Sequence, residues 1–276
     1  MGDARPIGIF DSGVGGLSVW REVLRQLPQE STVYFADSAH VPYGPRGEAE
    51  IRQFCEAITR FLIARDCKAV VVACNTASAA ALKHLRETFP DLPTLGMEPA
   101  VKPAAETTRS KVVGILATPA TFQGRLFAAT AGRTAYSQGI TLINQVCPGL
   151  AERIEAGQVD DPETEALLRG WLAPMLAAGA DSVVLACSHY PFVIGAIRRI
   201  VGAGVNVIDP APAIARQLQR VLRERGLEAT PGEPGRHRFY TSGDPAACRA
   251  ALARLVQQEG DVRSVVWADT GLSEAG

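Results

Sequence analysis

Two stretches of the sequence resemble each other and lie 113 residues apart: Val71-Val72-Ala73-Cys74-Asn75-Thr76 and Val184-Leu185-Ala186-Cys187-Ser188-His189. A second pair, Gly8–Ser12 and Gly114–Thr118, occurs in the same order at an offset of 106 residues. Each stretch is an apolar run, typical of a strand covered on both faces by helices, and ends in polar residues. Two matches in one order at nearly one offset indicate an internal duplication, which predicts two similar α/β lobes.

The rest of the chain alternates short apolar runs with longer helical patterns. Further strands are expected at 32–35, 140–143, 205–208, 236–241 and 263–267, and helices at 48–64, 78–88, 164–177 and 214–224. This alternation predicts two lobes, each a mostly parallel sheet flanked by helices, with the active site in the cleft between them.

The expected lobe boundaries lie at proline-containing segments, Glu98-Pro99 and Asp209-Pro210. The segment after the second boundary is too short to form a third lobe, so we expect it to return to the first lobe and complete it. The predicted domains are therefore 1–97 plus 209–276 for the first α/β lobe and 98–208 for the second.

Composition and charge exclude several classes of protein. The 276 residues carry 28 basic and 29 acidic side chains, and the net charge of −1 gives no electrostatic reason to expect nucleic acid or a membrane as a partner. The N-terminus has no apolar signal segment, and no run reaches the roughly 18 apolar residues of a membrane span. The six cysteines are scattered and form no C-x-x-C pair, so we expect a cytoplasmic protein without disulfides.

Cys74 and Cys187 are the candidate catalytic residues, because each follows a buried strand and precedes a helix, whose N-terminal partial positive charge stabilises a thiolate. A free cysteine is often only a small buried hydrophobe, but two in matching positions of two lobes favour function. Inversion of a carbon–hydrogen stereocentre needs a base on one face and an acid on the other, and two thiols can supply both. The other cysteines lack the strand-end context and are assigned to packing or to the surface: Cys55, Cys67, Cys147 and Cys248.

Polar residues near the same strand ends are candidate partners of the two thiols. His189 can assist Cys187 or be a structural histidine, and Asp11 can bias the proton at Cys74 or cap a turn. Glu155 is either a solvated helix residue or a partner of His189. Groups that could hold a substrate carboxylate or amino group belong to Ser12, Asn75, Thr76, Thr118, Ser188 and the turn at Tyr43-Gly44, which can equally be a plain β-turn.

We expect neither a cofactor nor a metal. The turn Gly13-Val14-Gly15, with Asp37 after the next strand, resembles a dinucleotide fingerprint, but Ser18 stands where glycine or alanine is expected. Pyridoxal phosphate needs a Schiff-base lysine, and none of the four lysines is at the carboxyl end of a strand: Lys68, Lys83, Lys102 and Lys111. Cys187 and His189 are the only close pair of metal ligands in the sequence.

Four ordered blocks of the sequence resemble the signature blocks of a known family. They are Phe10–Val19, Pro42-Tyr43-Gly44, Ala73–Ala77 and Cys187–Pro191. The family is that of the bacterial glutamate racemases, within the cofactor-independent aspartate/glutamate racemase superfamily. The resemblance covers almost the whole chain, from Ile7 to about Trp267.

The resemblance implies interconversion of L- and D-glutamate, which supplies D-glutamate for peptidoglycan, by two α/β lobes that usually form a homodimer. It implies that Cys74 deprotonates D-glutamate with help from Asp11, and that Cys187 deprotonates L-glutamate with help from His189 and Glu155. The substrate-binding residues that it implies are Asp11, Ser12, Pro42, Tyr43, Gly44, Asn75, Thr76, Thr118, Ser188 and His189.

The chain departs from the family pattern in two places. Ser188 stands where the family usually has threonine, and serine keeps the hydroxyl group. The run from Cys147 to Gly157 is a degenerate version of the family's run, so Glu152 stays an alternative to Glu155 as the partner of His189.

Two other functions stay open from the sequence. The same chemistry could racemise aspartate or another acidic amino acid. From a different class, a two-lobed protein could bind an acidic ligand without turnover, although binding alone needs neither cysteine.

Overall fold

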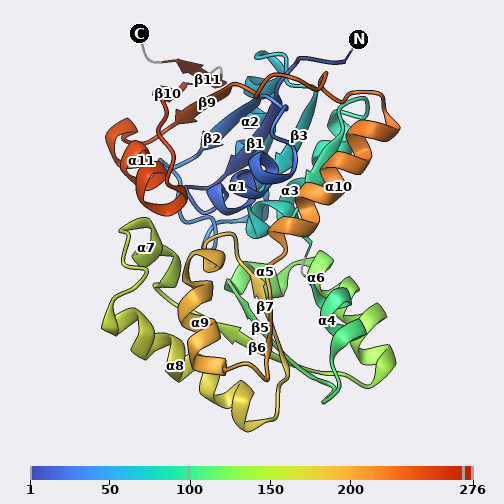
Figure 1. Ribbon diagram of the computed structural model, residues 1–276. Helices are drawn as coiled ribbons and strands as arrows, with labels where there is room; N and C mark the ends of the chain where they lie inside the picture. Colours follow the sequence, from blue (N-terminus) through green and yellow to red (C-terminus); the bar gives the residue numbers. More distant parts are fainter. Residues whose placement is uncertain (1, 99, 269–270, 275–276) are drawn as a thin grey trace. The chain divides into compact units, whose positions relative to one another are not determined.

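The computed structural model describes residues 2–98, 100–268 and 271–274, and it has the predicted α/β fold, with parallel sheets flanked by helices (Figure 1). The chain divides into two compact units. Unit 1 comprises Met1–Met97 with Ala211–Gly276, and unit 2 comprises Glu98–Pro210. The assignment of domains at 97/98 and 208/209 stays a prediction, and unit 2 extends slightly beyond it, to Pro210.

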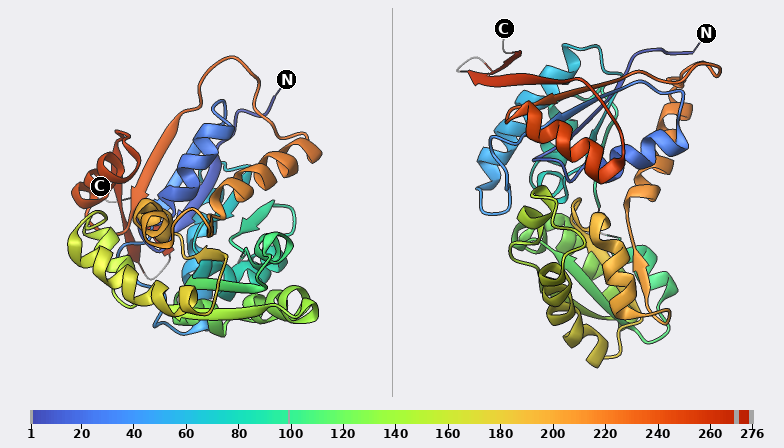
Figure 2. Two further views of the ribbon diagram at one scale, coloured as in Figure 1. Left: turned by 60° about the horizontal axis from the view of Figure 1, so that its bottom comes forward. Right: turned by 60° about the vertical axis from the view of Figure 1, so that its left-hand side comes forward.

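Unit 1 contains a seven-stranded sheet in the order β11-β10-β9-β2-β1-β3-β4. Neighbouring strands are parallel, except that β11 pairs antiparallel with β10 at one edge. The C-terminal strands thus lie beside the N-terminal ones, orange and red beside blue in Figure 2. The strand bounds are β1 (Ile7–Asp11), β2 (Thr32–Ala36), β3 (Ala69–Val72), β4 (Thr94–Gly96), β9 (His237–Thr241), β10 (Val262–Ala268) and β11 (Gly271–Glu274).

Helices cover both faces of this sheet. α2 and α3 pack against Phe10, Phe35 and Val72 on one face, and α1 and α10 lie side by side on the other (Figures 1 and 2). The bounds are α1 (Leu17–Gln26), α2 (Glu48–Ile63), α3 (Asn75–Thr88), α10 (Ala211–Glu224), α11 (Pro245–Ala251) and the π-helical turn η4 (Leu252–Val256).

Unit 2 contains a four-stranded parallel sheet in the order β6-β5-β7-β8. Its strands are β5 (Val112–Ala117), β6 (Thr141–Val146), β7 (Ser182–Ala186) and β8 (Asn206–Ile208). Its helical segments are α4 (Val101–Thr107), α5 (Pro119–Gln123), α6 (Arg125–Thr130), η1 (Ala131–Ala135), η2 (Tyr136–Gln138), α7 (Leu150–Glu155), α8 (Pro162–Ala177), η3 (Tyr190–Val193) and α9 (Ile194–Val201). Across the described ranges of both units, none of the helices has the length and apolar character needed to span a membrane.

The two sheets share one strand order, as the repeated sequence predicts. β2-β1-β3-β4 of unit 1 matches β6-β5-β7-β8 of unit 2, so β1 corresponds to β5 and β3 to β7. The match extends to packing: a Cβ on Gly8 of β1 would lie 2.9 Å from Cδ1 of Leu62 in α2, and one on Gly114 of β5 would lie 2.3 Å from Sδ of Met175 in α8. In each unit, a glycine in the central strand lets the corresponding helix approach closely.

The structure differs from the prediction at several element bounds and at one edge of the unit 1 sheet. β6 ends at Val146 instead of residue 143, because none of its six residues is fully buried and so no buried apolar run marks its end. α3 begins at Asn75 instead of Ser78, because the side chain of Cys74 caps it. The short edge strand β11 was not predicted, since it carries no apolar run.

A buried ion pair anchors the amino-terminal edge of the unit 1 sheet. Nζ of Lys68, directly before β3, lies 2.6 Å from Oε2 of Glu30, and both side chains have no exposed surface. Lys68 also donates to the backbone oxygen of Asp3, and Glu30 accepts the backbone N–H of Ala229. The pair therefore ties the N-terminal segment and β3 to the returning C-terminal segment.

Lys68→Ala is expected to lower the free energy of unfolding by about 3–5 kcal/mol, because it leaves the Glu30 carboxylate buried without its partner. Chemical denaturation followed by circular dichroism measures the change. The matched control is Lys83→Ala, which removes a lysine whose ion pair with Glu87 is exposed to solvent, and which should leave stability unchanged. Equal, small effects of the two substitutions would contradict the anchoring role of Lys68.

Candidate active site

The candidate residues lie where the strand order of each sheet reverses. In unit 1 this switch point is between β1 and β3, and the corresponding point in unit 2 is between β5 and β7. Ligands of open parallel sheets bind beyond the carboxyl ends of the strands at such a point. Asp11 ends β1, Cys74 follows β3, Thr118 follows β5 and Cys187 follows β7.

In unit 1, Cys74 is held at the N-terminus of α3. Its sulfur accepts the backbone N–H of Ala77 at 3.4 Å, and its side chain is 5% exposed. The thiol also donates to Oγ of Ser12 over 3.8 Å, and the Ser12 hydroxyl donates to Oδ1 of Asp11 over 3.3 Å. The helix N–H favours a thiolate, and the hydroxyl links the sulfur to a buried carboxylate.

Asn75 and Thr76, the first two residues of α3, directly follow the N-cap residue Cys74 and are buried. Both polar atoms of the Asn75 amide are buried and make no hydrogen bond to any other residue that the structure describes. A buried amide without a partner costs about 1–3 kcal/mol, and such groups in native proteins call for an explanation. A polar ligand beside Cys74 would supply the missing partner.

The loop after β2 contains Pro42, Tyr43 and Gly44. The Tyr43 ring is buried, and its hydroxyl donates to Oδ2 of Asp37 at 2.6 Å. Burial and then the Asp37 charge raise the pKa of Tyr43 well above its usual range, so the hydroxyl stays a donor. The Tyr43 hydroxyl is therefore engaged inside the protein.

In unit 2, the side chains of Cys187, His189 and Glu155 are connected by two successive polar contacts. Its sulfur lies 3.8 Å from Nδ1 of His189, and Nε2 of His189 lies 2.8 Å from Oε1 of Glu155. His189 is buried, and Glu155, the last residue of α7, is partly exposed. The histidine partner is therefore Glu155 in this structure, and the alternative, Glu152, lies one turn earlier on α7.

Burial opposes protonation of His189, but its hydrogen bonds to Cys187 and Glu155 outweigh that effect. Together they raise the pKa of His189 well above its usual range. A protonated imidazole donates through both ring nitrogens, one toward the sulfur and one toward the carboxylate. The two hydrogen bonds therefore favour the protonated form of the imidazole next to the Cys187 sulfur.

The other four cysteines were assigned to packing or to the surface, and the structure confirms packing, because all four are buried. Only the expectation that Cys147 lacks the strand-end context is wrong. Cys147 directly follows β6 and thus has the strand-end context that a predicted end at residue 143 concealed. Burial is the main reason that the pKa of Cys147 is raised to about 12, and the nearby Cys187 raises it further. Cys147 is consequently a protonated neighbour of the candidate site.

The remaining predicted residues are Thr118 and Ser188. Thr118 caps α5 by accepting the backbone N–H of Thr121, and Ser188 is buried between Cys187 and His189 in the sequence. Among the described residues, no group of three or more histidine, cysteine or acidic side chains could hold a metal ion.

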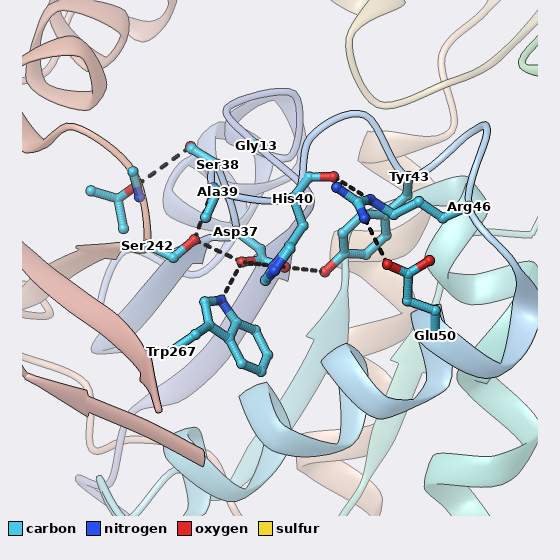
Figure 3. Close-up of polar contacts among 12 residues, drawn as sticks. Gly13, Asp37, Ser38, Ala39, His40, Tyr43, Arg46, Glu50, Ser242 and Trp267 are labelled. Carbon is cyan, nitrogen blue, oxygen red and sulfur yellow. Dashed lines mark hydrogen bonds and ion pairs between the residues drawn. The ribbon is translucent and has the colours of Figure 1, made fainter. Parts of the chain in front are cut away.

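Within each unit, the structure thus brings predicted residues into contact: Cys74, Ser12 and Asp11 in one, and Cys187, His189 and Glu155 in the other. Sequence reasoning considered Asp37 only for a dinucleotide site. The structure shows instead that it bonds to Tyr43 (Figure 3). The sequence could have indicated a role for Asp37, because this residue directly follows β2 and so lies at the same sheet edge as Asp11.

Comparison with known proteins agrees with this geometry. A model of the Asp/Glu/Hydantoin racemase family matches residues 7–218. The glutamate racemase of Stutzerimonas stutzeri (strain A1501) is 49% identical over 252 residues, covering 91% of this chain and 94% of the relative. That of Roseiflexus sp. (strain RS-1) is 50% identical over 253 residues, covering 91% and 92%.

Among solved structures, too, the chain is similar to glutamate racemases. A glutamate racemase isoform of Bacillus anthracis superposes with a TM-score of 0.86 at 32% identity, covering 94% of this chain and 97% of that one. The Francisella tularensis enzyme in complex with D-glutamate has a TM-score of 0.81 at 30% identity, covering 94% and 96%. The Escherichia coli enzyme in complex with L-glutamate and the activator UDP-MurNAc-Ala has a TM-score of 0.80 at 30% identity, covering 94% and 97%. The chain is therefore an isomerase of the Asp/Glu/Hydantoin racemase family, and within that family it belongs with the glutamate racemases.

Proposed function

We propose that the chain interconverts L- and D-glutamate by two proton transfers, one at Cys74 and one at Cys187. The observation that carries the proposal is the equivalence of the two thiols. Each follows the same strand of a repeated strand order, at the switch point where a parallel sheet binds ligands. Relatives whose structures contain D-glutamate or L-glutamate support the choice of substrate.

The proposed reaction uses one thiolate and one thiol. With D-glutamate, the Cys74 thiolate removes the Cα proton, and the Cys187 thiol delivers its proton to the opposite face of the carbanion. The products are L-glutamate, a Cys74 thiol and a Cys187 thiolate, which is the state that the reverse reaction requires. The two groups exchange roles with direction, so similar residues suit both positions.

Neighbouring groups set the proton at each sulfur. The Ala77 N–H stabilises a Cys74 thiolate, and Ser12 connects that sulfur to Asp11. The charge on His189 stabilises a Cys187 thiolate, and Glu155 holds the imidazole in place. These contacts support the roles that the family resemblance assigns to Asp11, His189 and Glu155.

Substrate binding is proposed for the polar groups around the strand ends. The unpartnered Asn75 amide is the strongest single indication, since a substrate carboxylate or ammonium group would satisfy it. The other proposed contacts come from Asp11, Ser12, Pro42, Tyr43, Gly44, Thr76, Thr118, Ser188 and His189.

The wider setting is proposed from the family. D-glutamate made by this chain would supply peptidoglycan synthesis, and the enzyme would act as a cytoplasmic homodimer. Six free cysteines, all of them buried, fit a reducing compartment.

Cys74→Ala and Cys187→Ala should each reduce kcat/KM for glutamate racemisation by about 10³-fold, because each removes an obligatory proton donor and acceptor. Circular dichroism of the two glutamate enantiomers follows the reaction. Cys67→Ala is the matched control, because Cys67 is also buried near β3 but lies at its opposite end, and burial raises its pKa to about 12.

A kcat/KM close to that of the wild type in either catalytic-cysteine variant would refute the mechanism. Faster turnover of aspartate than of glutamate by the wild type would instead identify an aspartate racemase. Binding of glutamate without any turnover would leave a binding protein as the function.

Replacing Glu155 by glutamine should change the pH dependence of stability. The pKa of His189 is higher in the folded protein than the value of about 6.5 expected for the unfolded chain, so protonation of His189 stabilises the fold. This stabilisation is fully present below about pH 6.5 and is lost as the pH rises through the folded-state pKa. Glu155→Gln removes one cause of the raised pKa, so the free energy of unfolding should fall less steeply above pH 6.5 than in the wild type. Urea unfolding at several pH values measures both slopes, and identical slopes would contradict the assigned ion pair.

A further inference from the structure

The carboxylate of Asp37 is a fully buried acceptor of four side-chain hydrogen bonds (Figure 3). Oδ1 accepts from Ser242 Oγ at 2.7 Å and from Trp267 Nε1 at 2.9 Å. Oδ2 accepts from the Tyr43 hydroxyl at 2.6 Å and from His40 Nδ1 at 3.0 Å. A carboxylate only accepts hydrogen bonds, so Nδ1 of His40 carries the hydrogen.

The four donors come from two distant parts of the chain. His40 and Tyr43 belong to the loop of residues 38–46, which follows β2 and which we name the β2 loop. Ser242 directly follows β9, and Trp267 lies in β10, so both belong to the C-terminal return of unit 1. Asp37 therefore joins the β2 loop to strands that lie beyond residues 7–218, the range that the family model matches.

Further contacts connect the same two segments. Ser242 Oγ donates to Asp37 and also accepts the backbone N–H of Ala39 at 3.1 Å. The His40 ring stacks on Phe54 with centroids 3.9 Å apart, and its centroid lies 4.9 Å from that of Trp267 in an edge-on arrangement. The C-terminal return thus contacts both the backbone and the side chains of the β2 loop.

The β2 loop also holds itself together and adjoins the Cys74 region. Nε of Arg46 donates to the backbone oxygen of His40 at 2.7 Å, closing the loop. The backbone N–H of Asp37 donates to the backbone oxygen of Asp11 at 3.0 Å. Asp37 is therefore hydrogen-bonded to the backbone of Asp11, the residue whose carboxylate Ser12 links to Cys74.

A buried carboxylate needs hydrogen-bond partners, and these four bonds could serve only to stabilise Asp37 in the fold. Two features indicate that they also position the β2 loop. The Tyr43 hydroxyl is wholly engaged with Asp37, so the network determines where the backbone of Pro42 and Gly44 lies. Two of the four donors come from the C-terminal return rather than from the loop itself, so that segment contributes to holding the loop.

We propose that Trp267 and Ser242, acting through Asp37, are positioning residues that hold the β2 loop in its substrate-binding conformation. The proposal rests on the proposed function, which assigns substrate contacts to Pro42, Tyr43 and Gly44. It predicts that weakening the Asp37 network impairs binding of glutamate while leaving proton transfer at the two sulfurs intact.

Trp267→Phe tests the proposal, because it removes the Nε1–H donor and keeps an aromatic ring against His40 and Phe54. The expected result is an increase of about tenfold in KM for both glutamate enantiomers with little change in kcat, since a hydrogen bond to a charged group is lost. Hydrogen–deuterium exchange measured by mass spectrometry should be faster in peptides that cover residues 38–46. Ser242→Ala should produce the same two changes independently.

Trp20→Phe is the matched control. Trp20 is also buried and also donates its Nε1–H at 2.9 Å, but to Thr32 at the opposite end of β2. This substitution has a comparable chemical effect far from the β2 loop, and it should leave KM and the exchange of residues 38–46 unchanged.

Equal KM and exchange in Trp267→Phe, Ser242→Ala and Trp20→Phe would overturn the proposal, and so would faster exchange of the β2 loop without a rise in KM. A fall in kcat alone would also overturn it, because it would place the effect on proton transfer. If the wild type does not turn over glutamate, the proposed function fails, whereas the exchange measurement still decides whether the C-terminal return orders the β2 loop.

Discussion

The parallel pairing of β1 with β3, and of β5 with β7, is the constraint on which the candidate site depends. Parallel strands end at the same edge of a sheet, so the residues that follow them are brought together however far apart they are in sequence. In unit 1 this places Asp11 and Ser12 in the same hydrogen-bonded group as Cys74, more than 60 residues later. The helix that must begin after β3 then directs a backbone N–H at the Cys74 sulfur.

The two units use the same backbone arrangement for different electrostatic environments. Cys74 is linked through a hydroxyl to a carboxylate, whereas Cys187 lies next to an imidazole whose pKa is raised. The difference comes from a few residues at equivalent strand ends, with Asn75-Thr76 after one cysteine and Ser188-His189 after the other. A duplicated scaffold with different side chains in each copy suits a reaction in which two similar groups act on mirror-image substrates.

Sequence reasoning succeeded where local pattern determines structure. The buried strands, and the positions of Cys74 and Cys187 directly after two of them, could be predicted, because a buried parallel strand is a continuous apolar run whose end is visible in the sequence. It failed at β6, where no residue is fully buried, so that the sequence does not mark the end of the strand or the position of Cys147 after it. It also could not find the Asp37 network or the Lys68–Glu30 pair, because both depend on contacts between segments that no local pattern connects.

The most direct test of the account is the fate of solvent deuterium at Cα under initial-rate conditions, with each glutamate enantiomer as substrate in D₂O. Two separate thiols predict deuterium in the product enantiomer and none in the recovered substrate, because the proton removed by one sulfur is not the one delivered by the other. Mass spectrometry of the separated enantiomers measures both. Deuterium in the recovered substrate as well as in the product, or transfer of the original proton into the product, would show that a single group serves both faces and would contradict the account.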